Sequence, residues 1–351
     1  MSPDFPSHPL SERARRSLAR IGPPAEPRST STNSDGDAPA GETDDGRAYH
    51  LTRTEDAAEG IRRVIIGRLD DAVEQLRERV ADDPVTAVHE ARKDLKKARS
   101  AIRLARGAVG RKRYRAANRG LRDAARELSG TRDADVRSET LRRLRETFSD
   151  ELSAATATAI EAEIEAAGRA APGGSIAAAD LTDVAARAAA EIERIRAAVA
   201  GWKLSAGGWK LVGPGLERGY RRGRLEFRRV LDGPTPEAIH VWRKRAKDLW
   251  YHLRLVRRSW PKVLDATIAE AHELTDLLGD HHDLTALRDH LRSRAAGSTD
   301  ADRDAEIMEL IERRQEQLAE QAIPLGERLY AEKPSAFAAR IARYWRAWRV
   351  D

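Results

Sequence analysis

The residues best suited to chemistry in this chain form two copies of one helical pattern. Residues 88–106 read VHEARKDLKKARSAIRLAR, and residues 239–257 read IHVWRKRAKDLWYHLRLVR. Imidazole, guanidinium and ammonium groups repeated at this density favour anion binding. At a constant spacing the polar residues coincide as His89 with His240, Arg92 with Arg243, Lys93 with Lys244, Lys96 with Lys247, Arg103 with Arg254, and Arg106 with Arg257.

Each copy places its basic residues on one face of a helix. At about 100° per residue, the first copy puts an apolar stripe that includes Leu95 and Ile102 opposite the cations. The acids Glu90, Asp94 and Asp248 fall on the flanks, so no acid is expected to neutralise the basic face. Because like charges one turn apart repel by a few tenths of a kcal/mol, the pattern predicts a bound anion. The predicted basic faces comprise His89, Arg92, Lys93, Lys96, Arg99 and Arg103 in one copy, and His240, Arg243, Lys244, Lys247 and Arg254 in the other.

A third basic helix is expected to join the site in the first half only. Arg115, Arg119, Arg122 and Arg126 recur at spacings of three and four residues, which places them on one helix face. The corresponding segment of the second half offers only His272. We therefore include Arg119, Arg122 and Arg126 in the site and expect it to be asymmetric.

The charge distribution points to a polyanionic ligand. Residues 86–145 contain 19 Lys or Arg against 7 Asp or Glu, and residues 215–262 contain 14 against 5, in a chain of net charge +6. The rest of the chain is therefore acidic. Such local basic blocks create a positive potential that attracts anions.

Composition indicates an all-α protein. Aromatic residues make up 5% of the 351 residues, and Ala, Arg, Leu and Glu dominate. The absence of Cys excludes disulfides and thiolate metal sites. We find neither an apolar run of about 18 residues nor a secretory signal. These features predict a cytoplasmic protein without membrane contact.

The order of helical segments predicts two halves, each similar to a four-helix bundle. Residues 1–47 are rich in Pro, Ser, Gly and Asp and are expected to be a disordered arm. A domain over 48–345 follows, with halves 48–172 and 175–345 that meet at Pro172-Gly173-Gly174. Residues 201–215, with five glycines and a proline, are expected to form a loop. Helices are predicted over 54–81, 86–108, 112–128, 133–148, 151–171, 181–199, 216–231, 236–259, 263–278, 283–294, 302–330 and 335–349.

Other polar residues suggest structural roles rather than chemistry. Asp133 and Asp283 each follow a glycine-containing break and suit helix N-caps. His281, His282, Asp283 and His290 resemble a metal set, but their position at a helix start favours structure over metal. Neither a P-loop nor a nucleophile with its base is evident. No cofactor, metal or catalytic residue is therefore expected.

The doubled motif resembles the CHAD family, the conserved histidine α-helical domain. The matching features are His-x-x-Arg-Lys-x-x-Lys at His89 and His240, and the turns at Gly130 and Gly279, within about residues 50–345. The resemblance implies two helical bundles, related by a pseudo-twofold axis, around a basic cleft or pore that binds inorganic polyphosphate. It also implies localisation to polyphosphate granules. The ligand contacts that the resemblance implies are His89, Arg92, Lys93, Lys96, His240, Arg243, Lys244 and Lys247.

The sequence therefore predicts a non-catalytic polyphosphate-binding module. Trp250 and Tyr251 stand where the first copy has Arg99 and Ser100, so the two halves are not expected to contact the ligand equally. CYTH domains, which process triphosphate and are fused to some CHAD domains, carry Glu-x-Glu-x-Lys; Glu161, Glu163 and Glu165 do not match it. The alternatives are nucleic-acid binding by the same basic surface and a phosphatase acting on polyphosphate or an organic phosphate.

Overall fold

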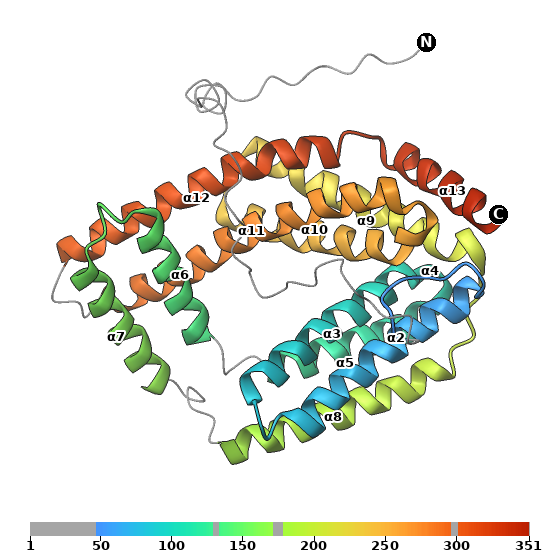
Figure 1. Ribbon diagram of the computed structural model, residues 1–351, viewed down its shortest axis with the longest axis horizontal. Helices are drawn as coiled ribbons and strands as arrows, with labels where there is room; N and C mark the ends of the chain where they lie inside the picture. Colours follow the sequence, from blue (N-terminus) through green and yellow to red (C-terminus); the bar gives the residue numbers. More distant parts are fainter. Residues whose placement is uncertain (1–46, 129–132, 171–177, 296–300, 351) are drawn as a thin grey trace, which may run out of the picture.

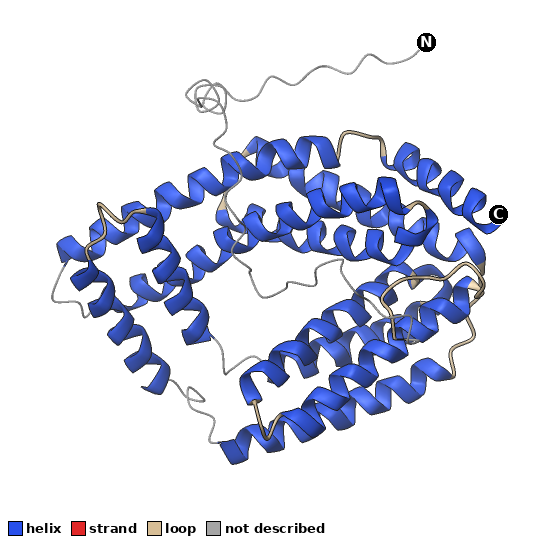
Figure 2. Ribbon diagram, viewed as in Figure 1, coloured by secondary structure: helices blue, strands red, loops and turns tan. Residues whose placement is uncertain are grey.

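The computed structural model describes residues 47–128, 133–170, 178–295 and 301–350. In these ranges the chain forms twelve α-helices and no strand (Figure 2). The predicted all-α class is confirmed. The N-terminal arm, the turn at Gly130 and the junction at Pro172 lie outside the described residues, as does the side chain of the predicted N-cap Asp133.

Four helices from the first part of the chain form one bundle (Figure 1). Each helix packs against two others around buried aliphatic residues, among them Ile61, Leu69, Leu95 and Ile192. The helices are α2 (Ala57–Glu74), α3 (Pro84–Leu104), α5 (Arg111–Glu127) and α8 (Ala178–Ala200). The π-helical turn η1 (Gln75–Arg79) extends α2, and the short α4 (Arg106–Val109) joins α3 to α5.

The remaining helices form a second group above the first in the view of Figure 1. They are α9 (Gly208–Asp232), α10 (Pro236–Val256), α11 (Pro261–Ala295), α12 (Ala301–Leu329) and α13 (Pro334–Val350), with the 3₁₀ turn η2 (Arg257–Ser259) between α10 and α11. One hydrophobic core runs through both groups, from Tyr49 to Trp345. The two groups are therefore packed as one structural unit.

Helices α6 (Asp133–Thr147) and α7 (Ala154–Ala170) lie apart from the first bundle. They pack against each other, and α6 also packs against α11 and α12. Their buried side chains, such as Leu144 and Ile160, share a second, smaller core with Leu287 and Ile307. The division into halves 48–172 and 175–345, and their pseudo-twofold relation, stay predictions.

The predicted break at Gly279 is wrong. Helix α11 runs unbroken from Pro261 to Ala295, so Asp283 lies within a helix and is not an N-cap. The apolar stripe continues across the glycine, with Leu278 and Leu284 both buried. A helical Gly costs about 1 kcal/mol relative to Ala, which the burial of these leucines offsets.

The predicted loop over 201–215 is also wrong in its second part, because α9 begins at Gly208. A Cβ atom at Gly215 would lie 1.8 Å from the carbonyl oxygen of Leu104. Trp202 is buried, and the ring of Trp209 packs 6.0 Å from that of Trp345. The small residues here allow α9 to approach the end of α3, rather than marking a loop.

Candidate functional site

The two motif helices start in the same way. Helix α3 is capped by Asp83, whose carboxylate accepts a 3.0 Å hydrogen bond from the backbone N–H of Thr86. Helix α10 is capped by Thr235, whose hydroxyl accepts one of 3.2 Å from Ala238. In both helices Pro occupies the first turn, where its missing N–H costs nothing. These signals place His89 and His240 in the first two turns of their helices.

The two motif helices contact each other where the two groups of helices meet. Arg103 Nη2 lies 2.6 Å from Asp248 Oδ1, and His252 Nε2 lies 3.2 Å from the carbonyl oxygen of Ser100. Because each contact joins α3 to α10, the basic residues of both copies belong to one region of the molecule.

An acid partly neutralises the first motif, contrary to the prediction. Lys93 Nζ lies 3.0 Å from a carboxylate oxygen of Glu90, one turn earlier on α3. Lysine has the reach to pair with an acid on the flank of its own helix, which a helical wheel does not represent. The remaining motif residues of this half, His89, Arg92 and Lys96, are half-buried on the same helix.

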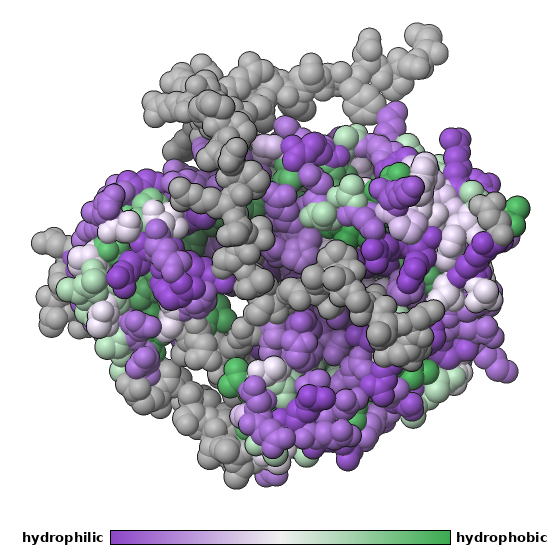
Figure 3. Space-filling view, in the orientation of Figure 1, coloured by the Kyte–Doolittle hydropathy of each residue, from purple (hydrophilic) through white to green (hydrophobic). Residues whose placement is uncertain are grey.

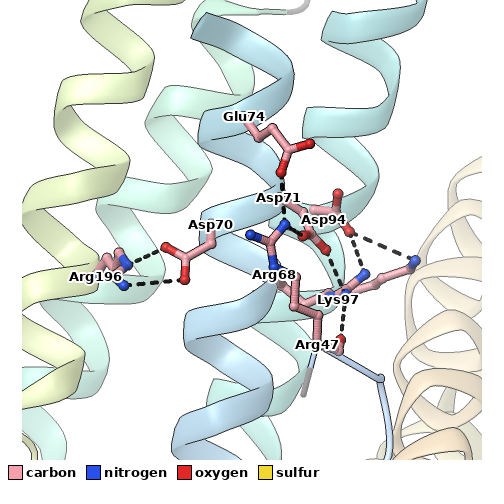
Figure 4. Close-up of polar contacts among 8 residues, drawn as sticks. All are labelled: Arg47, Arg68, Asp70, Asp71, Glu74, Asp94, Lys97 and Arg196. Atoms are coloured by element: carbon pink, nitrogen blue, oxygen red, sulfur yellow. Dashed lines mark hydrogen bonds and ion pairs between the residues drawn. The ribbon is translucent and has the colours of Figure 1, made fainter. Parts of the chain in front are cut away.

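The flank of α3 is held by an ion-pair network with α2 (Figure 4). Arg68 lies 3.1 Å from Asp94 and 2.6 Å from Asp71, while Lys97 lies 3.8 Å from Asp94. Burial raises the pKa of the Asp94 carboxyl to about 6, against the opposing effect of Lys97 and Arg68. These charges fix the orientation of α3 relative to α2.

A cluster of arginines gathers where α3 meets α5. Burial lowers the pKa of the Arg99 guanidinium to about 10, and the nearby charges of Arg103 and Arg122 lower it further. Arg99 Nε donates a 3.3 Å hydrogen bond to Asn118 Oδ1 on α5. The structure therefore brings Arg99, Arg103 and Arg122 together as predicted from helix spacing.

The other predicted arginines of α5 are placed differently. Arg126 and Arg122 lie 2.6 Å and 2.9 Å from the same oxygen of Asp123. Arg119 lines a groove between α5 and α8. Only Arg122 of this series is therefore linked to the charges of Arg99.

The second motif faces acids and histidines from α11. The rings of His240 and His282 lie 4.1 Å apart. Burial lowers the pKa of the Lys247 ammonium to about 8, although Asp276 and Asp283 favour its charged form. Asp283 thus lies close to a motif cation, a role that its expected position as an N-cap did not predict.

Arg254 has a different environment from its counterpart Arg103. It is 9% exposed, and its guanidinium carbon lies 5.1 Å from the centre of the Trp250 ring and 5.5 Å from that of Tyr49. Such cation–π contacts stabilise a cation with little water around it. The two halves therefore place equivalent arginines against an acid and against aromatic rings, respectively.

Comparison with protein families decides the identity of this arrangement. A model of the CHAD domain matches residues 63–292, which include α3, α10 and most of α11. The chain belongs to the CHAD domain family. CHAD domains are associated with polyphosphate. A comparison with curated proteins gives no match.

This CHAD domain contains a further group of arginines that the motif did not indicate. Arg218 on α9 is partly buried, and burial together with the charges of Arg106 and Arg222 lowers its pKa. The guanidinium carbon of Arg106 lies 4.9 Å from the centre of the Tyr114 ring. Arg218 and Arg222 are one turn apart within the basic block 215–262, and this spacing was the signal that could have found them.

The histidine-rich segment of the CHAD domain is used for helix packing. The carbonyl oxygen of His281 accepts hydrogen bonds from Gln315 Nε2 at 3.1 Å and from the Thr285 hydroxyl at 3.0 Å. In the described residues, no group of three or more His, Asp or Glu side chains is placed to hold a metal ion. No helix among them is long and apolar enough to cross a membrane. The face seen in Figure 3 is mainly hydrophilic, with apolar side chains in small patches.

Proposed function

We propose that this protein binds inorganic polyphosphate through the basic residues of α3 and α10, without converting it. The observation that carries the proposal is the contact between the two motif helices through Arg103, Asp248 and His252. A flexible phosphate chain could then bind basic groups from both halves at once. The proposed ligand contacts are the residues predicted from the sequence, with Arg99, Arg103 and Arg122 as the densest group.

The chemistry of these side chains suits a phosphate chain. Guanidinium groups form paired hydrogen bonds with phosphate oxygens, and affinity arises largely from charge neutralisation. A bound polyanion would also relieve the repulsion that lowers the pKa of Arg99. Binding should therefore weaken steeply as the salt concentration rises.

Aromatic burial argues against the nucleic-acid alternative for this surface. Trp250 and Tyr251 are the aromatic residues within the second motif, and they are 2% and 3% exposed. Buried rings are not accessible for base stacking, on which proteins that bind single-stranded nucleic acid depend. The proposed ligand is therefore a chain of phosphates without bases.

The decisive experiment combines Arg92→Glu with Arg243→Glu. We expect this variant to lose polyphosphate binding in titration calorimetry, with unchanged helicity by circular dichroism. Arg145→Glu with Arg228→Glu, two exposed arginines on α6 and α9, gives the same change in net charge and should bind as the wild type does. Unaltered binding by the first variant would exclude the site.

Two further measurements separate this function from its alternatives. Excess polyphosphate should displace a fluorescent RNA or DNA oligonucleotide, and failure to do so would favour nucleic acid. Purified protein with Mg²⁺ should release no orthophosphate from polyphosphate, whereas release that His89→Ala abolishes would indicate a phosphatase. In cells, the tagged protein should colocalise with polyphosphate granules.

A further inference from the structure

A second basic groove lies on the surface of the first bundle, between α5 and α8. It has a volume of about 960 Å³. Its cations come from both walls: Arg111, Lys112, Arg115 and Arg119 from α5, and Arg187 and Arg194 from α8. The groove is separate from the motif residues of α3 and α10, none of which lines it.

The acids of this groove are already paired with other arginines. Asp123 accepts contacts from Arg122 and Arg126, and Glu191 lies 2.6 Å from Arg194. Only Glu127 adds a further acid to the lining. Within the described part of the chain, none of the other five lining cations forms an ion pair with an acid. The groove therefore carries an excess of positive charge.

This distribution is costly for α5 without an anion. Arg111, Arg115 and Arg119 follow one another at one-turn spacing, where like charges destabilise a helix by about 0.2–0.5 kcal/mol per pair. The first turn of α5 contains no acid, although the positive end of the helix dipole favours one. A bound anion would offset both effects.

The floor and walls of the groove suit a narrow ligand. A Cβ atom at Gly120 would lie 2.6 Å from Glu191 Oε1 and 2.7 Å from Ile195 Cδ1, so the two helices are in close contact at the floor. No aromatic residue is found among the lining residues. A ligand with bases would find no stacking surface here, whereas a phosphate chain needs only cations.

We propose that the groove between α5 and α8 is a second binding site for inorganic polyphosphate, distinct from the site on α3 and α10. The proposal rests on the proposed function only for the choice of ligand, because its residues are different. A protein with two such sites could hold two segments of one long chain, which would raise its avidity for long polyphosphate over short.

The test uses the full chain and a polyphosphate too short to reach both sites. Titration calorimetry of the wild type should give two bound chains per protein. Arg115→Glu with Arg119→Glu should leave one, and Arg92→Glu with Arg243→Glu should leave the other. Arg145→Glu with Arg228→Glu, matched in net charge, should keep both.

The outcomes distinguish the two proposals. If the Arg115 and Arg119 variant still binds two chains, or if the wild type binds one chain that only the Arg92 and Arg243 variant loses, the groove assignment is overturned and the proposed function stands. If the groove variant loses all binding and the motif variant loses none, the groove assignment stands and the motif site fails. Loss of oligothymidylate binding in the groove variant with unchanged polyphosphate binding would overturn the assignment in favour of nucleic acid.

Discussion

The two motif helices carry the same pattern but have different surroundings. Around α3 the neighbouring basic groups are arginines, with Arg99 close to Arg103 and Arg122. Around α10 the neighbours on α11 are acids and histidines, with His282 stacked on His240 and Asp283 close to Lys247. A repeated sequence motif thus specifies the cations, while the helix packed beside it decides whether their charge is permanent or depends on pH.

The largest difference concerns two glycines, one beside each motif helix. Gly215→Ala should destabilise the protein by about 2–3 kcal/mol, because its Cβ would overlap the Leu104 carbonyl at 1.8 Å and force the α9 and α3 backbones apart. Gly279→Ala should be neutral or stabilising by up to about 1 kcal/mol, because its Cβ would meet Arg243 Nε at an ordinary 3.6 Å and Ala favours helix. Urea denaturation of both variants measures this; equal effects would contradict the close approach at Gly215.

A smaller effect is the acid sensitivity of the second half. Burial lowers the pKa of His252, His281 and His282 to about 4, below the ordinary value near 6.5. Between these values the unfolded state binds more protons, so stability is complete near pH 7 and falls as the pH drops from about 6.5 to about 4. Asp94, with a pKa raised to about 6, opposes this trend over part of the range.

The variant His252→Gln tests that trend. It keeps a side-chain amide for the Ser100 carbonyl and removes one titrating group, so it should reduce the loss of stability between pH 7 and pH 4.5 by on the order of 2 kcal/mol. Urea denaturation at several pH values measures the slope. A slope identical to that of the wild type would show that His252 does not contribute.

The sequence predicted the parts of this structure that depend on local signals. The starts of α3 and α10 follow from a capping residue and a proline, Asp83 with Pro84 and Thr235 with Pro236, which act within one turn. Fold class and the opposite placement of apolar and basic stripes follow from periodicity in the same way.

The sequence failed where a residue's role depends on a distant segment. Gly215 and Gly279 were taken as signs of loops and breaks, yet both lie inside helices beside another element. Arg218 was missed because a wheel of one helix does not show that α9 packs beside α4 and Arg106. The pairing of Asp283 with a basic face likewise required knowing that α11 continues past Gly279 along α10.

The smallest predicted effect compares one cation from each half. Arg99→Gln should weaken polyphosphate binding about tenfold, because Arg99 belongs to the cluster with Arg103 and Arg122 and no ligand-bound guanidinium replaces it. Lys244→Gln should weaken binding only about threefold, because Lys244 is exposed and its charge is screened by water and salt. Calorimetric titrations at one salt concentration give both affinities. If Lys244→Gln costs as much as Arg99→Gln, the two halves contribute equally and the asymmetry of their surroundings has no consequence for binding.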